Sequence, residues 1–211
     1  MTHPSDDPRP TTDERYTSAT HAKNLKMETE KIGAIDLLTA AAWSPRAIGS
    51  ALLRLHSEWD GCQHPRRIKR EALEALALTL QGFTRDRDQK AKRIANDWYE
   101  HEVRLMLQRL KSLPLVRALM VAQAEKWMIE DADRTVAGVL IWWLDHTCPT
   151  CNGLKFEKFE GAPALSAIRC RHCHGAGEIP TPYSFEGRRL AGFIQDCLND
   201  SRRFIRKVVR P

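Results

Sequence analysis

Apolar residues recur every three or four positions along most of this chain of 211 residues. Ile48, Leu52 and Leu55 show this spacing, which is typical of one face of an α-helix. Signals for a helix start, such as Ser44 followed by Pro45, divide the pattern into short helices. The segments interpreted as helices in the first two thirds of the chain are 30–43, 45–60, 66–82, 89–111, 114–129 and 132–144. Short helices joined by short loops predict an antiparallel helical bundle over residues 28–146.

The two ends of the chain differ from this pattern. Residues 1–27 are rich in Pro, Asp, Thr and Ser and show no apolar period, so they are predicted to be a disordered tail. Residues 181–211 keep a long apolar stripe, and most of their arginines lie on the opposite face. This segment is predicted to be a basic amphipathic helix.

Two C-x-x-C pairs lie in the segment 147–180, which we call the cysteine module. Each pair continues with a glycine, in the pattern C-x-x-C-x-G, and residues 152–169 separate the pairs. The spacing is typical of a structural zinc site with four thiolate ligands, in which glycines permit sharp turns around the metal. The predicted ligands of Zn²⁺ are Cys148, Cys151, Cys170 and Cys173.

Other interpretations of the cysteines are possible but less favoured. Redox catalysis requires a βαβ context that is not visible, iron–sulfur binding also uses four cysteines, and disulfides suit a secreted protein. His146, His172 or His174 could replace a cysteine as a ligand. The residues 154–159 and 166–170 are interpreted as two short strands of a zinc ribbon. The predicted fold class is therefore mainly α, with an inserted zinc ribbon or knuckle and a basic C-terminal helix.

The net charge of +6 favours a polyanionic partner, and the excess lies mostly at the C-terminus. A second group of basic residues lies beside an internal helix start. The candidate nucleic-acid contacts are Arg188, Arg189, Arg202, Arg203, Arg206, Lys207 and Arg210 in the last helix, and Arg85, Arg87, Lys90, Lys92 and Arg93 in the second group.

Several function classes are not expected. The chain contains no phosphate-binding loop, dinucleotide motif or nucleophile elbow, and a zinc ion with four cysteine ligands has no open position for catalysis. The longest apolar run, 136–144, is too short to span a membrane, and the first residues do not read as a secretory signal. We therefore expect a cytoplasmic protein that is not an enzyme.

A helical N-terminal part, a C-x-x-C-x-G…C-x-x-C-H-G-x-G module and a basic helical tail resemble the lambdoid-phage late-gene antitermination protein Q family. The resemblance implies a protein of the host cytoplasm that binds DNA near a promoter and loads onto RNA polymerase. The knuckles are also similar to those of DnaJ-type chaperones, although no His-Pro-Asp tripeptide occurs here. The positions that carry the first resemblance are Cys148, Cys151, Gly153, Cys170, Cys173, Gly175 and Gly177.

Two functions follow as hypotheses. The first is a zinc-containing, DNA-binding transcription regulator of phage or prophage type. The second is a zinc-stabilised adaptor that docks on a protein such as RNA polymerase or a chaperone client. In that case Phe193, Phe204 and Ile205 of the last helix are the expected anchors.

Overall fold

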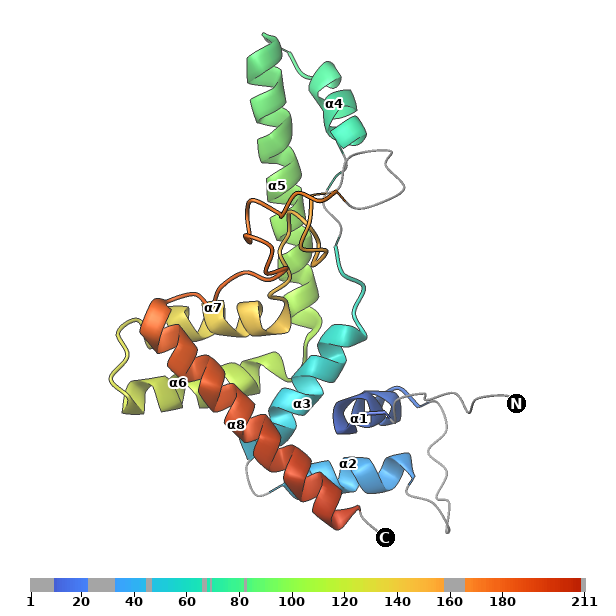
Figure 1. The fold of residues 1–211 in the computed structure, drawn as a ribbon, viewed down its shortest axis with the longest axis vertical. Coiled ribbons are helices and arrows are strands. Elements are labelled where there is room, and N and C mark those ends of the chain that lie inside the picture. Colours follow the sequence, from blue (N-terminus) through green and yellow to red (C-terminus); the bar gives the residue numbers. More distant parts are fainter. Residues whose placement is uncertain are drawn as a thin grey trace, which may run out of the picture.

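The computed structural model describes residues 10–22, 33–44, 47–65, 68, 70–81, 83–157 and 166–209 (Figure 1). Within these ranges the chain forms helices and no β-strand, which confirms the predicted mainly α fold. The helices are α1 (Thr12–Thr20), α2 (Ala34–Ala42), α3 (Ala47–Asp60), α4 (Arg70–Thr79), α5 (Thr84–Arg109), α6 (Leu113–Lys126), α7 (Ala132–Leu144) and α8 (Ser184–Val208). No helix in these ranges combines the length and the apolar character that crossing a membrane requires.

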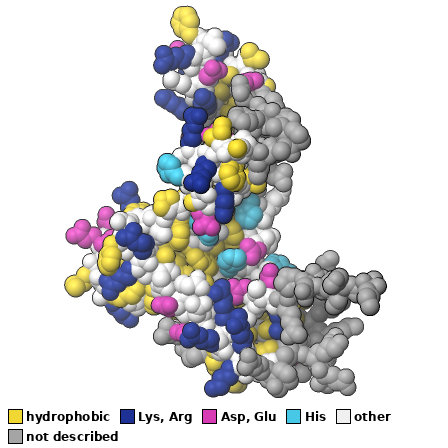
Figure 2. Space-filling view, in the orientation of Figure 1, with side chains coloured by type: hydrophobic (Ala, Val, Ile, Leu, Met, Phe, Trp, Pro, Cys, Tyr) yellow, Lys and Arg dark blue, Asp and Glu magenta, His cyan; other side chains and the backbone are white. Residues whose placement is uncertain are grey.

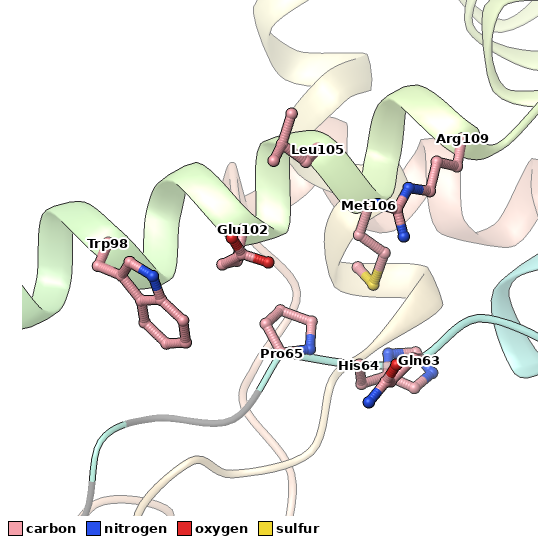
Figure 3. Close-up of a pocket in the computed structure, with 8 residues that line it drawn as sticks. All are labelled: Gln63, His64, Pro65, Trp98, Glu102, Leu105, Met106 and Arg109. Atoms are coloured by element: carbon pink, nitrogen blue, oxygen red, sulfur yellow. The ribbon is translucent and has the colours of Figure 1, made fainter.

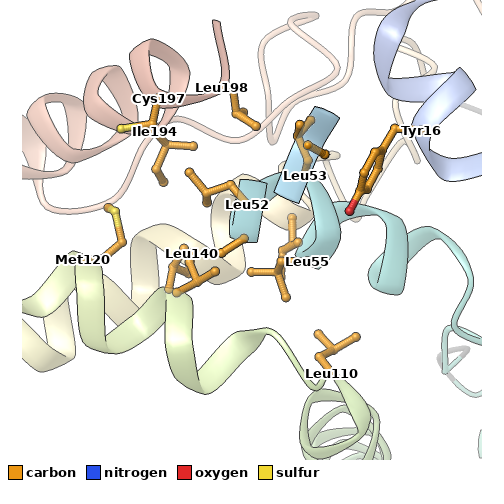
Figure 4. Packing of buried hydrophobic residues seen from close by; sticks show 14 of the residues in the cluster. Tyr16, Leu52, Leu53, Leu55, Leu110, Met120, Leu140, Ile194, Cys197 and Leu198 are labelled. Atoms are coloured by element: carbon orange, nitrogen blue, oxygen red, sulfur yellow. The ribbon is translucent and has the colours of Figure 1, made fainter. Parts of the chain in front are cut away.

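Six helices, α1, α2, α3, α6, α7 and α8, pack around one hydrophobic core and form what we call the body. Leu52 and Leu55 of α3 meet Leu140 of α7 and Ile194 of α8 in this core, and all four are fully buried or nearly so (Figure 4). The apolar stripe of α8 thus packs on the body from Leu190 to Ile205.

A serine interrupts the apolar stripe of α8 at the point where α8 crosses α3. Ser201 is completely buried, and its hydroxyl lies 2.9 Å from that of Ser44. A Cβ atom added at Gly49 of α3 would lie 2.1 Å from Oγ of Ser201. The small residues therefore let the two helices approach closely, and the contact with Ser44 satisfies the buried hydroxyl of Ser201.

The helices α4 and α5 pack against each other and extend away from the body as an arm (Figure 1). The side chains buried in the arm include three alanines, Ala77, Ala91 and Ala95, so its helices approach closely but bury little apolar volume. Several larger apolar side chains of the arm stay exposed, namely Leu78, Phe83, Ile94 and Trp98. The predicted bundle over 28–146 is thus divided between the body and the arm.

The helix α1 lies in the segment that the sequence analysis predicts to be disordered, so this prediction is wrong for residues 12–20. The hydroxyl of Thr11 accepts a hydrogen bond from the backbone N–H of Glu14, and the carboxylate of Glu14 accepts one from the N–H of Thr11. This capping box stabilises the helix start. Tyr16 and Ala19 are buried in the core of the body, and this tertiary packing compensates for a poor apolar pattern. Residues 1–9 and 23–27 of the predicted tail lie outside the described ranges.

The helix α5 also begins earlier than its apolar pattern indicates. The sequence GFTRDRD is interpreted as a break, whereas the helix starts at Thr84. Arg, Asp, Gln and Lys fill its first turns, and such residues form helices without producing an apolar period.

Candidate metal centre

The structure brings the four predicted cysteine ligands together. The Sγ atoms of Cys148 and Cys170 lie 3.9 Å apart, those of Cys151 and Cys173 lie 3.7 Å apart, and all four sulfurs are within 4.8 Å of one another. A disulfide requires about 2.05 Å between sulfurs, so these contacts are not disulfides. Around a tetrahedral zinc ion with bonds of about 2.3 Å, sulfurs lie about 3.8 Å apart. The cluster therefore has the dimensions of a four-thiolate metal site.

The two knuckles form a repeat that is offset by 22 residues, as from Cys148 to Cys170. The backbone N–H of Cys148 donates to the carbonyl of Gly177, and the N–H of Cys170 donates to the carbonyl of Lys155, each at 2.9 Å. The next bonds outward are also equivalent, from Ile179 to His146 and from Glu157 to Ile168. This reciprocal pairing holds the two halves of the sulfur cluster face to face. The sequence pattern C-x-x-C-x-G shows the centre of this repeat, and the hydrogen bonds extend the repeat to the residues on either side.

The turns that follow each C-x-x-C pair use left-handed backbone conformations at equivalent positions. The three pairs of positions with positive φ are Asn152 and His174, Gly153 and Gly175, and Lys155 and Gly177. At Gly177, φ is +84° and an added Cβ would lie 2.9 Å from the carbonyl oxygen of Gly153, so this position requires glycine. Lys155 adopts φ of 69° with a side chain present, which is a conformation that lysine disfavours.

Backbone N–H groups point at the sulfurs and favour thiolates. Burial raises the pKa of the Cys173 thiol, but the N–H groups of Gly177 and Gly175 outweigh this effect and bring the pKa to about 6. For Cys148, the N–H groups of Cys151 and Thr150 likewise overcome burial and hold the pKa below its ordinary value. Burial dominates at Cys151 and raises its pKa to about 11. Because adjacent thiolates repel one another, a cation among the sulfurs would stabilise all four together.

The cysteine module is attached to the C-terminal end of α7. The indole N–H of Trp142 donates a hydrogen bond of 2.9 Å to the carbonyl of Ile179, at the end of the module. The ring of Trp142 also stacks obliquely on that of His146, with the centroids 5.4 Å apart. His146 therefore packs against α7, and His172 and His174 are exposed. Among the described residues, the group that can hold a metal consists of the four cysteines.

The surroundings of the cluster match the sequence analysis only in part. One isolated bridge, Phe156 with Arg169, stands where the ribbon strands are predicted, and a second, Thr147 with Glu178, lies outside the predicted strands. Residues 158–165 lie outside the described ranges. Arg171, which lies between two of the cysteines in the sequence, pairs with Glu157 at 3.2 Å.

Three of the candidate nucleic-acid residues on α8 have partners inside the protein. Arg202 forms a bidentate ion pair with Asp13 of α1, and its Nε donates at 2.8 Å. Nε of Arg206 donates to the hydroxyl of Thr12 at 3.0 Å. The guanidinium of Arg189 lies 4.0 Å from the ring centroid of Trp127. These contacts attach α1 and α6 to α8. The sequence analysis does not predict the contacts with α1, because it interprets α1 as disordered.

Most of the other candidate nucleic-acid residues are exposed to solvent. Arg188, Arg203 and Lys207 are exposed on α8, and Arg206 is also exposed beside its contact to Thr12. Arg210 lies outside the described ranges. The second group lies at the start of α5, near the end of the arm, where Arg85, Lys90, Lys92 and Arg93 are exposed and Arg87 is half-buried.

The residues expected to anchor an adaptor to its partner pack, wholly or in part, inside the body. Ile205 is buried in the core, and Phe193 packs against it, with its ring edge-on to Trp127 at 5.5 Å. Phe204 is half-buried. The apolar face of α8 is therefore an internal contact.

Comparisons with known proteins give no match for this chain: no protein-family model, no curated protein and no solved structure is significantly similar to it.

Proposed function

We propose that the protein is a zinc-containing, DNA-binding regulator of transcription. Four buried sulfurs at zinc-like spacing support the metal, and zinc is the common occupant of tetrahedral four-cysteine sites. Such a centre has no open coordination position, so its role is to fix the loop between α7 and α8 rather than to catalyse a reaction.

The DNA-binding part of the proposal rests on how α8 packs against the body. Its apolar face is buried in the body, while Arg188, Arg203 and Lys207 point away from the core and are exposed. In the orientation of Figure 2, Lys and Arg side chains appear over the C-terminal part of α8 and over the arm. A rigid helix with exposed cations fits the phosphate backbone of DNA, whose contacts position a protein on the duplex.

The test compares two triple variants with the same change in net charge. The first replaces Arg188, Arg203 and Lys207 by Gln, and the second replaces Arg104, Lys111 and Lys126, which are exposed on α5, between α5 and α6, and on α6. At a fixed, low salt concentration, the first should weaken duplex binding at least about tenfold, whereas the second should change it much less. Equal effects of the two variants would show that only overall charge matters and would contradict the proposal.

A role with RNA polymerase, as in antitermination, is the more specific form of this proposal. It rests on the resemblance of the cysteine module to the antitermination protein Q family. Transcription through a terminator in a purified system, with and without the protein, would test it. Unchanged termination would remove this form of the proposal and leave DNA binding in place.

A protein-interaction adaptor is the second candidate, and the arm favours it. Phe83 is 85% exposed and Leu78 76% exposed, so the arm offers large apolar side chains to a partner. At the base of the arm, a cavity of about 720 Å³ lies between α5 and the segment after α3 (Figure 3). Trp98 and Leu105 provide apolar walls of this cavity, and Glu102 and Arg109 provide charges.

The adaptor predicts that a complex with a polymerase or a chaperone client survives nuclease treatment. Replacing Phe83 and Trp98 by Ala should abolish that complex without changing DNA affinity. A complex that disappears after nuclease treatment would favour DNA as the link between the partners.

A further inference from the structure

Gly192 lies in the middle of α8 on its exposed side, and no contact within the described part of the protein accounts for a glycine there. A Cβ atom added at this position meets no heavy atom within 4 Å. At Gly187 of the same helix, an added Cβ would lie 1.7 Å from the carbonyl oxygen of Pro182. Glycine destabilises the interior of a helix relative to alanine. A glycine without an internal reason therefore points to an external partner that approaches the helix backbone closely.

The residues on the same face of α8 as Gly192 are mostly polar or charged, with the exposed Phe185 near the start of the helix and the carboxylate of Asp196 one turn after Gly192. At helical spacing, Gly192 and four of them form what we call the outward row: Arg188, Gly192, Gln195, Asn199 and Arg203. Arg188, Gln195 and Arg203 are exposed, and Asn199 is half-buried. Asp196 is an exposed carboxylate beside the row, and Arg206 continues its positive end. The row from Arg188 to Arg203 is about 22 Å long at the rise of an α-helix.

Two amide side chains in the row are held by contacts that reach back into the body. Nε2 of Gln195 donates to Oδ1 of Asn199 at 3.1 Å, and Nη1 of Arg202 donates to the same oxygen at 3.3 Å. Arg202 is itself fixed by Asp13 of α1, and its side chain is only 26% exposed. These contacts orient the amides before any ligand binds, so Arg202 acts as a positioning residue.

We infer that the outward row is the base-reading surface of the protein and that it enters the major groove of duplex DNA. This inference rests on the proposed DNA-binding function. The major groove admits an α-helix, and amide side chains can pair with adenine while arginine pairs with guanine or phosphate. Gly192 lets the helix backbone approach the bases. Gln195 reads a base through its Oε1 and its second amide hydrogen, whereas Asn199, whose Oδ1 already accepts two hydrogen bonds, reads a base by donating from Nδ2. Arg188 and Arg203 contact the DNA on either side of them. A carboxylate such as that of Asp196 can accept a hydrogen bond from cytosine.

Gly192→Ala should increase the stability of the protein and decrease its affinity for DNA. The substitution should raise the midpoint of thermal unfolding, because alanine favours a helix. It should also weaken binding to the preferred duplex, selected from a random library with the wild-type protein, by about tenfold. The control is Val208→Ala, an exposed residue away from the row, which should leave affinity unchanged. Unchanged affinity of the Gly192 variant would overturn the close approach at this position.

Base preference provides the second readout. Repeating the selection with Gln195→Ala should relax the preference at one base position without changing the salt dependence of binding. Asp13→Asn should blur the preference at the positions read by Gln195 and Asn199, because it releases Arg202. An unchanged preference in the Gln195 variant overturns base reading, and an unchanged preference in the Asp13 variant removes the positioning role of Arg202. In both cases DNA binding itself persists, whereas a wild-type protein that binds no duplex contradicts the proposed function instead.

Discussion

The body and the cysteine module bury different kinds of side chain. The core of the body is made of Leu, Ile, Val, Met and Ala from six helices, and the burial of apolar surface stabilises it. Among the described residues of the module, the buried cluster consists of the four cysteines alone. The apolar surface buried in these described parts is too small to compensate for the entropy of ordering their backbone. From this comparison we expect the module, but not the body, to need a bound metal for its structure.

The largest expected effect is that of Cys170→Ser, which separates the two regions. Three thiolates no longer complete the tetrahedral site, so we expect loss of the zinc ion and unfolding of the segment between Thr147 and Glu178. The body should keep its helices. Zinc content by mass spectrometry and protease sensitivity of the segment measure the effect. Cys62→Ser is the control, because Cys62 lies outside the cluster and should leave zinc content unchanged. A protease-resistant, zinc-free module would contradict this view.

The next effect is that of Leu52→Ala in the body. Leu52 is completely buried, and the cavity left by the substitution should lower the free energy of unfolding by about 3–5 kcal/mol. The matched control is Leu78→Ala in the arm, where the side chain is 76% exposed and the expected change is below about 0.5 kcal/mol. Denaturant unfolding measures both changes, and both variants should retain zinc. Similar losses in the two variants would show that the arm is more buried than the structure indicates.

The helices of the body could be predicted from the sequence because their apolar periods are strong. For α1 the apolar signal is weak, yet the sequence from Thr11 to Glu14 contains the pattern of a capping box, which would have located the helix start. The ion pair of Asp13 with Arg202 could not be predicted, because it joins residues far apart in the chain. Because of this ion pair, Arg202 is interpreted as an internal contact between α8 and α1 and not as a phosphate contact.

The candidate metal site could be predicted almost completely, because the spacing of C-x-x-C pairs encodes the geometry of a four-ligand site. The pattern C-x-x-C-x-G-x-G also aligns the two knuckles, with Lys155 standing where the second knuckle has Gly177. The spacing did not predict the reciprocal hydrogen bonds between the knuckles, because these join Cys148 to Gly177 and Cys170 to Lys155 across the module.

The smallest expected effects come from exchanging residue types at these equivalent positions. Gly177→Ala should destabilise the module by about 1–3 kcal/mol, because φ is +84° and the new Cβ meets the carbonyl of Gly153. Lys155→Gly should stabilise it by about 0.5–1 kcal/mol, since glycine adopts the left-handed conformation without strain. The resistance of bound zinc to a competing chelator reports both. Changes of the same sign would contradict the equivalence of the two knuckles.

The central claim is that α8 presents an exposed cationic surface to DNA, and the salt dependence of duplex binding by the wild-type protein tests it most directly. If Arg188, Arg203 and Lys207 each neutralise one phosphate, the logarithm of the binding constant should fall linearly with the logarithm of salt concentration. The expected slope is about −3, from about −0.9 for each contact. No binding at low salt, or binding that does not change with salt, would contradict the account.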